Sequence, residues 1–97
     1  MFQNLDPLLH SQLRLAIISI LVSVEEAEFS FLKEKTNASS GNISVQIEKL
    51  QEANYIKIEK SFKGTYPLTK CSITKKGIKA FDEYVNALKQ YINPGEQ

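Results

Sequence analysis

The fold is decided by the stretch FSFLKEKTNASSGNISVQIEKLQEANYIKIEKSFKG, residues 29–64. Within it, Ile43, Ile47 and Leu50 recur at three- and four-residue spacings, which is typical of one buried face of a helix. After Asn54 the apolar residues alternate with charged ones, and a period of two predicts a strand with one buried face. The stretch therefore predicts a helix followed directly by strand structure.

A second helix is predicted just before that one. Ser30 can cap a short helix at about residues 31–36, and Ser39 can cap the longer helix at residues 40–53, because serine is a favoured N-cap. Asn54 can end the longer helix, since asparagine tolerates the left-handed conformation. Two helices joined by a turn of about three residues fit a helix-turn-helix.

Residues 55–73 predict a β-hairpin. Its turn is Lys63–Pro67, where Gly64 permits a positive φ and the proline cannot occupy a central strand. Thr74 can then cap a last helix at about residues 74–92. The apolar stripe expected to be buried on that helix is Ile78, Phe81, Tyr84, Val85, Leu88 and Ile92.

The N-terminal part predicts one more helix. Residues 8–22 carry an apolar stripe at helical spacing, and Asp6–Pro7 is a plausible start. The acidic segment Glu25–Glu28 has no periodicity, so we expect a solvated connection there. A hairpin directly after a helix-turn-helix is the wing of a winged helix, a far more specific signal than any single element.

Composition bounds the class of protein. The 97 residues are 42% hydrophobic and 24% charged, which predicts one globular domain over residues 1–97 and excludes a disordered or fibrous chain. One cysteine excludes an intramolecular disulfide. Without a signal core or an apolar run of roughly 20 residues, we expect a cytoplasmic protein with no membrane partner.

Charge is unevenly distributed along the chain. Residues 55–79 contain seven lysines and one glutamate, although the formal net charge of the chain is only +1. A local basic block favours a face that binds a polyanion. The alternative is an ordinary solvated lysine surface.

The resemblance to a known family rests on three stretches. Residues 29–64 resemble the helix-turn-helix and wing of small bacterial and archaeal winged-helix transcriptional regulators of the short MarR/ArsR-like type. HSQLRLAIISIL, residues 10–21, is similar to their first helix, and LTKCSITKKGIKAFDEYVNAL, residues 68–88, resembles their second wing strand and closing helix. The most specific motifs are Gly41–Asn42–Ile43–Ser44 with Leu50, and Thr74–Lys75–Lys76–Gly77.

This resemblance implies an α+β, mostly helical fold: a three-helix core, a β-hairpin wing and a C-terminal helix. The helix-turn-helix would occupy about 30–53, the wing about 55–73 and a dimerisation helix about 74–92. It further implies a homodimeric repressor bound to a pseudo-palindromic operator in double-stranded DNA. The chain lacks the helical extensions of typical MarR proteins and the cysteine pair of metal-sensing ArsR relatives, so no effector or metal is carried over.

The outward side of helix 40–53 is the candidate DNA-reading surface. Ser40, Gly41 and Ser44 permit close approach to the bases, and the amides of Asn42 and Gln46 can pair with adenine edges. Strand alternation points one lysine of the wing, Lys60, inward, but near the wing tip it is expected to lie beyond the core. The candidate DNA-binding residues are Ser39, Ser40, Asn42, Ser44, Val45, Gln46, Lys49, Lys60, Lys63, Thr65 and Tyr66.

The last helix carries more apolar surface than a small domain can cover, which predicts a two-fold dimer interface. Its candidate residues are Leu5, Leu8, Phe81, Tyr84, Val85, Leu88, Tyr91 and Ile92. Two alternatives remain open. One is a winged-helix protein-interaction module without DNA binding, and the other is a small sensor with a ligand between the dimerising helices.

Enzymatic or metal chemistry is not expected. Cys71 shares a strand face with Ile73, so it should be buried and structural rather than a redox sensor. His10 has no second metal-ligating residue near it in sequence. No phosphate loop, nucleophile elbow or convincing carboxylate pair is present, so the sequence predicts no cofactor.

Overall fold

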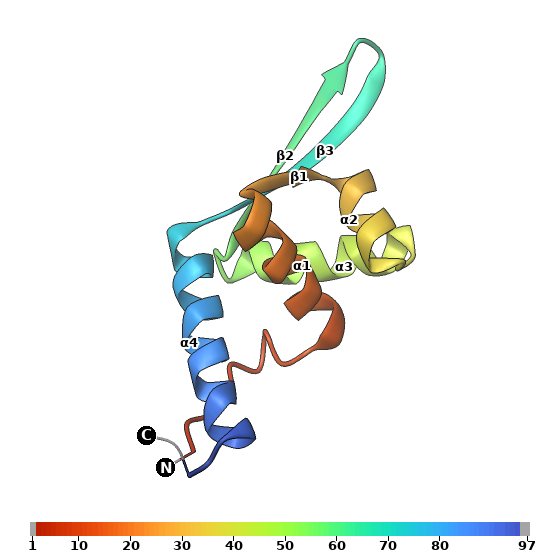
Figure 1. The fold of residues 1–97 in the computed structure, drawn as a ribbon. Coiled ribbons are helices and arrows are strands. Elements are labelled where there is room, and N and C mark those ends of the chain that lie inside the picture. The colour runs from red at the N-terminus through yellow and green to blue at the C-terminus, as the bar shows by residue number, and fades with distance from the viewer. Residues whose placement is uncertain (1, 96–97) are drawn as a thin grey trace.

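Four helices and a three-stranded antiparallel sheet make up the computed structural model, which describes residues 2–95 (Figure 1). This is the winged helix architecture that the sequence predicts. In chain order the elements are α1 (Gln12–Val24), β1 (Glu26–Glu28), α2 (Phe29–Thr36), α3 (Ser40–Glu52), β2 (Ile56–Lys63), β3 (Tyr66–Ile73) and α4 (Lys75–Ile92).

The acidic segment before α2 is a strand, so the prediction of a solvated connection was wrong. β1 pairs with β3, giving the sheet order β1-β3-β2, and Ala27 lies opposite Cys71. Ala27 is buried while Glu26 and Glu28 point to solvent. A strand of three residues with one inward alanine is too short to show a period of two. Its pairing depends on β3, which is far away in the sequence.

Helix α1 begins at Gln12, four residues later than predicted. Asp6 caps a turn instead of the helix: its Oδ1 accepts a hydrogen bond from the amide of Leu8 at 2.9 Å. The amide of Leu9 closes that turn onto the carbonyl of Asp6 at 3.1 Å. The apolar residues of the turn pack on the core, so they imitate a continuing helical stripe in the sequence.

The helix-turn-helix follows the predicted order. Helix α2 begins at Phe29 rather than after Ser30, and its N-cap makes no side-chain hydrogen bond. Asn37 adopts the left-handed conformation at φ 58°, and the Ser39 hydroxyl accepts from the amide of Asn42 at 3.2 Å. The left-handed residue after α3 is Asn54, at φ 64°. Both the cap at Ser39 and the stop at Asn54 are therefore confirmed.

The core lies between α1, α2, α3 and the base of the sheet. Ile43, Ile47 and Leu50 are buried, as predicted, in one cluster with Ile17 and Leu21 of α1. Burial of each such side chain contributes about 1.5–3 kcal/mol. This packing holds the buried face of α3 against the body and leaves the opposite face in solvent.

The prediction for the buried face of α4 holds for Tyr84 and is wrong for the other five residues of the stripe, none of which is fully buried. The N-cap of the helix is confirmed, because the Thr74 hydroxyl accepts from the amide of Gly77 at 3.0 Å. The buried residues, however, are Gly77, Ala80, Tyr84 and Ala87. A Cβ atom on Gly77 would lie 2.2 Å from the Tyr55 carbonyl oxygen, so α4 approaches the body through small side chains.

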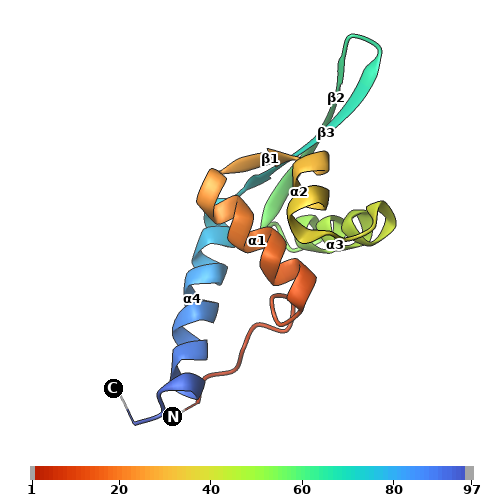
Figure 2. The same cartoon turned by 45° about the vertical axis from the view of Figure 1, so that its right-hand side comes forward.

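The larger apolar residues of α4 lie to one side of that contact. We call Ile78, Phe81, Val85, Leu88 and Ile92 the outer stripe; Ile78 is 45% exposed and Ile92 66% exposed. Figure 2 shows α4 and the hairpin leaving the body at opposite ends, and the longest extent of the molecule is 56 Å. None of the helices within residues 2–95 combines the length and apolarity needed to cross a membrane.

Candidate nucleic-acid interface

The outward side of α3 is slim and polar. We call Ser40, Asn42, Ser44, Val45 and Gln46 the α3 face; all are exposed except Gln46, which is half-buried. Val45 is 49% exposed and is the one apolar member. Next to this face, a Cβ atom on Gly41 would meet no heavy atom within 4 Å. A duplex could therefore approach the helix backbone closely.

The amide side chains of this face belong to a hydrogen-bonded row. Arg14 of α1 donates from Nη1 to Gln46 Oε1 at 2.6 Å, and Gln46 Nε2 donates to Asn42 Oδ1 at 2.9 Å. The Nε–H group of Arg14 donates to the carbonyl of Leu8, also at 2.6 Å. The row explains why Gln46 is less exposed than its neighbours on α3.

The outer part of the hairpin, residues 60–67, forms a projecting β-arm (Figure 1). Every residue of this arm is exposed, including Lys60, Lys63 and Thr65, and Tyr66 is 75% exposed. The expectation that Lys60 lies beyond the core is confirmed. The arm and the α3 face are the two surfaces to which the sequence assigned DNA contacts.

A groove runs between α3 and the hairpin, and both elements contribute residues to its lining. Ser44, Glu48 and Gln51 line it on the helix side, and Lys60 and Thr69 line it on the hairpin side. Gln51 Oε1 accepts from the backbone amide of Ile58 at 2.8 Å, which ties the helix to the base of β2. The groove is lined by both a carboxylate, from Glu48, and an ammonium group, from Lys60.

Two other lysines make contacts with neighbouring side chains of the protein. Lys70 Nζ lies 3.5 Å from a carboxylate oxygen of Glu26 on β1. Lys76 Nζ lies 5.8 Å from the ring centroid of Tyr55. Such contacts reduce what these two lysines offer to a polyanion. Lys49, Lys60 and Lys63, the strongest candidates from the sequence, are exposed.

Two residues that the sequence analysis did not select lie at these surfaces. Phe62 is 73% exposed on the arm, on the same strand face as Lys60. Extending the alternation of β2 by two residues would have found it. Arg14 is 32 positions from Gln46, and no local spacing signals that contact.

The candidate dimer residues separate into two groups. Phe81, Val85, Leu88 and Ile92 lie on the outer stripe; Ile92 is exposed and the other three are half-buried, with Phe81 and Leu88 packed against the edge of the core. The remaining four do not belong to that stripe. Leu5 and Leu8 pack on the core, and the Tyr91 hydroxyl donates to the Gln3 carbonyl. Tyr84 is only 5% exposed, so its assignment to the dimer surface was wrong: it is a core residue.

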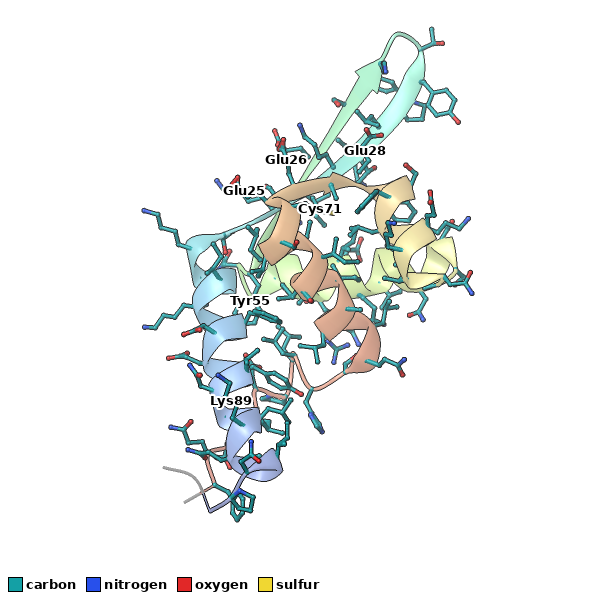
Figure 3. All side chains as sticks on the ribbon, in the orientation of Figure 1. Glu25, Glu26, Glu28, Tyr55, Cys71 and Lys89 are labelled. Atoms are coloured by element: carbon teal, nitrogen blue, oxygen red, sulfur yellow. The ribbon has the colours of Figure 1, made fainter. Side chains whose placement is uncertain are left out.

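The reactive side chains of the body are held in structural contacts. Cys71 is buried on β3, opposite Ala27 of the neighbouring strand β1 (Figure 3), and burial raises the pKa of its thiol to about 11, as expected for an inert cysteine. His10 Nδ1 lies 3.0 Å from the Tyr84 hydroxyl. Across residues 2–95, no group of three or more His, Cys, Asp or Glu side chains could hold a metal ion.

Tyr55 links the N-terminal segment to the start of α4. Its hydroxyl donates to Asp6 Oδ2, and its carbonyl accepts from the hydroxyl of Thr74 at 3.0 Å. Burial, and then the hydrogen bond to the carboxylate, raise the pKa of Tyr55 to about 12. The phenol therefore stays protonated at neutral pH and serves as a structural donor.

Known proteins share this architecture. Residues 13–92 match the family model described as winged helix DNA-binding domain. An uncharacterized protein of Methanocaldococcus jannaschii, MJ0432, is 35% identical over 81 residues, covering 84% of this chain and 88% of its own length.

Two solved structures share the fold. A transcriptional regulator homologue from Pyrococcus horikoshii superimposes with a TM-score of 0.84 at 24% identity, covering 93% of this chain and 89% of that one. The regulator BldR from Sulfolobus solfataricus gives 0.71 at 20% identity, covering 87% and 59%. The chain belongs to the winged helix DNA-binding domain family.

Proposed function

We propose that this protein is a sequence-specific transcriptional regulator of the MarR/ArsR-like kind, a homodimeric repressor that inserts α3 in the major groove of an operator. The observation that carries the proposal is the α3 face, which is small, polar and exposed beside a lysine-bearing arm. A major-groove helix needs a narrow outward side and hydrogen-bonding groups at the base edges. The exposed part of α3 meets both requirements, with Ser44 on the flank toward the hairpin and Gln46, bonded to Asn42, on the flank toward α1.

The proposed contacts are of two kinds: those that read the base sequence and those that position the protein on the phosphate backbone. Asn42 and Gln46 would contact base edges, and Val45 would touch a thymine methyl group. Ser39, Ser40, Ser44 and Thr65 would bind phosphates or bases through their hydroxyl groups. The lysines Lys49, Lys60 and Lys63, with the Tyr66 hydroxyl, would hold the phosphate backbone and so fix the register without reading the sequence.

The dimer would form through the outer stripe of α4. Its residues are spaced by three and four, the pattern of a helix that packs against another helix. A two-fold partner would cover this stripe and present a second α3 about 34 Å away, one turn of B-DNA. In this arrangement residues 1–97 act as one cytoplasmic domain, and the bound dimer would repress by occluding promoter DNA.

Selection of bound duplexes from a random library tests binding, sequence and symmetry together. The proposal predicts an enriched site with two related half-sites, and affinity that collapses as salt rises because counterions are released. A variant with Lys49, Lys60 and Lys63 all changed to alanine should lose most of that salt dependence. If no duplex binds even at low salt, the α3 face docks a protein instead and the regulator is excluded.

A further inference from the structure

The row Arg14–Gln46–Asn42 has a fixed direction, because its first member can only donate. A guanidinium carries N–H donors and no acceptor. Gln46 must therefore turn its oxygen, Oε1, toward Arg14 and its Nε2 toward the next residue of the row. Asn42 in turn must present its oxygen to Gln46, which leaves its own amide N–H groups directed away from the row.

Arg14 is itself held by two bonds of a fork. Nε donates to the Leu8 carbonyl and Nη1 donates to Gln46, each at 2.6 Å. Leu8 is half-buried against the core, so the hydrogen bond from Arg14 Nε to the Leu8 carbonyl fixes one side of the guanidinium to the body. A planar guanidinium bound at two points loses little further freedom on binding, and a lysine could not reproduce this geometry.

We propose that Arg14 is a positioning residue for base recognition: through Gln46 it turns the Asn42 amide so that α3 offers N–H donors to acceptor edges in the major groove. Such edges are the N7 of purines, O6 of guanine and O4 of thymine. The inference rests on the proposed DNA binding and adds the chemical class of base that Asn42 selects. Arg14 acts here without touching DNA.

The variant Arg14→Met tests this role, since methionine keeps an unbranched side chain but removes every donor. The ratio of affinities for the selected operator and for a shuffled duplex should fall about tenfold per half-site, the size of one lost base contact of about 1.4 kcal/mol in each protomer. The salt slope should stay unchanged. Lys89→Met, at the far end of α4 (Figure 3), removes the same charge and should change neither quantity.

A double-mutant cycle with Asn42→Ala isolates the mechanism. If Arg14 acts through Asn42, Arg14→Met causes no further loss of discrimination once Asn42 is alanine. Replacing the contacted purine by its 7-deaza analogue should likewise remove the effect of Arg14→Met. Additive losses in the cycle, or an equal loss on both duplexes with a shallower salt slope, would overturn the proposal and make Arg14 a phosphate contact.

The free protein gives a separate readout. In ¹H–¹⁵N spectra without DNA, Arg14→Met should shift the side-chain amide signals of both Gln46 and Asn42, and Lys89→Met should shift neither. Unmoved amide signals would refute the row itself. Shifted signals in a protein that binds no duplex would instead refute the proposed regulator function and the base-recognition role that depends on it.

Discussion

Helices α3 and α4 both leave one face uncovered, and the two faces have opposite chemistry. The α3 face carries two serines and two amide side chains with a single valine. The outer stripe of α4 consists of five large apolar residues, with Ile78 and Ile92 about half or more exposed. Exposed apolar area costs about 25 cal/mol per Å², so the stripe gains from another apolar surface, whereas the α3 face is already stable in water.

The α3 face and the outer stripe of α4 therefore suit different partners. A polar groove with a regular pattern of donors and acceptors fits α3, and a second copy of α4 fits the stripe. The two helices also differ in the surroundings of their glycines. Gly77 of α4 touches the Tyr55 backbone, while Gly41 of α3 faces open space.

The largest effect expected is on folding. Gly77→Ala should lower the free energy of unfolding by about 3 kcal/mol, because its new methyl group would collide with the Tyr55 carbonyl and α4 would have to shift. Gly41→Ala, the matched change on α3, should be neutral or stabilise by up to about 1 kcal/mol. Denaturant unfolding measures both variants, and equal losses would contradict the difference in packing.

The next effect concerns self-association. Val85→Glu places an unpaired charge in the outer stripe and should raise the dimer dissociation constant about 30-fold, a cost of about 2 kcal/mol. Val45→Glu, on α3, should leave association unchanged and weaken DNA binding. Sedimentation equilibrium measures the dissociation constants of these proteins. A wild-type protein that is monomeric at micromolar concentration would contradict the proposed dimer.

A smaller effect is expected from a single lysine of the arm. Lys63→Ala should weaken binding to all duplexes alike and reduce the slope of log K against log salt by about 0.9 per half-site, the contribution of one phosphate contact in each protomer. Lys89→Ala serves as the control, because that lysine lies on the last turn of α4. An unchanged slope for Lys63→Ala would remove this residue from the interface.

The smallest effect is at high pH. The folded state holds the pKa of Tyr55 at about 12, above the ordinary value of 10, so its contribution to stability is complete below pH 10 and is lost as pH rises toward 12. Tyr55→Phe should remove that part of the decline in unfolding free energy. Identical pH profiles for the two proteins between pH 10 and 12 would contradict the raised pKa that burial and the hydrogen bond to Asp6 give Tyr55.

Local signals explain most of what the sequence predicted about the fold. The Ser39 cap, the stop at Asn54 and the buried face of α3 follow from residue types and spacing. The strand β1 could not be predicted, because Ala27 gains its partner, Cys71, from 44 positions away. The buried face of α4 was missed for a related reason: small residues are buried where backbones approach closely, which hydrophobic periodicity does not register.

The candidate interface was predicted in part. Exposure of the α3 face and the arm followed from periodicity and from the distance of the arm from the core. The row that begins at Arg14 could not be foreseen, since it joins α1 to α3 through tertiary packing alone. The alternation of β2 places Phe62 on the same strand face as Lys60 and could have predicted its exposure. The lysines on either side of it gave a stronger signal, which favoured charged contacts.

The most direct test of the central claim is a titration of the protein with its selected duplex, followed by backbone ¹H–¹⁵N spectra at low salt. We expect the shifted signals to cluster in residues 39–49, which are the N-cap and first part of α3, and in residues 60–67 of the arm. The signals of the outer stripe of α4 should not move. Shifts concentrated on α4, or no shifts with any duplex, would contradict the central claim.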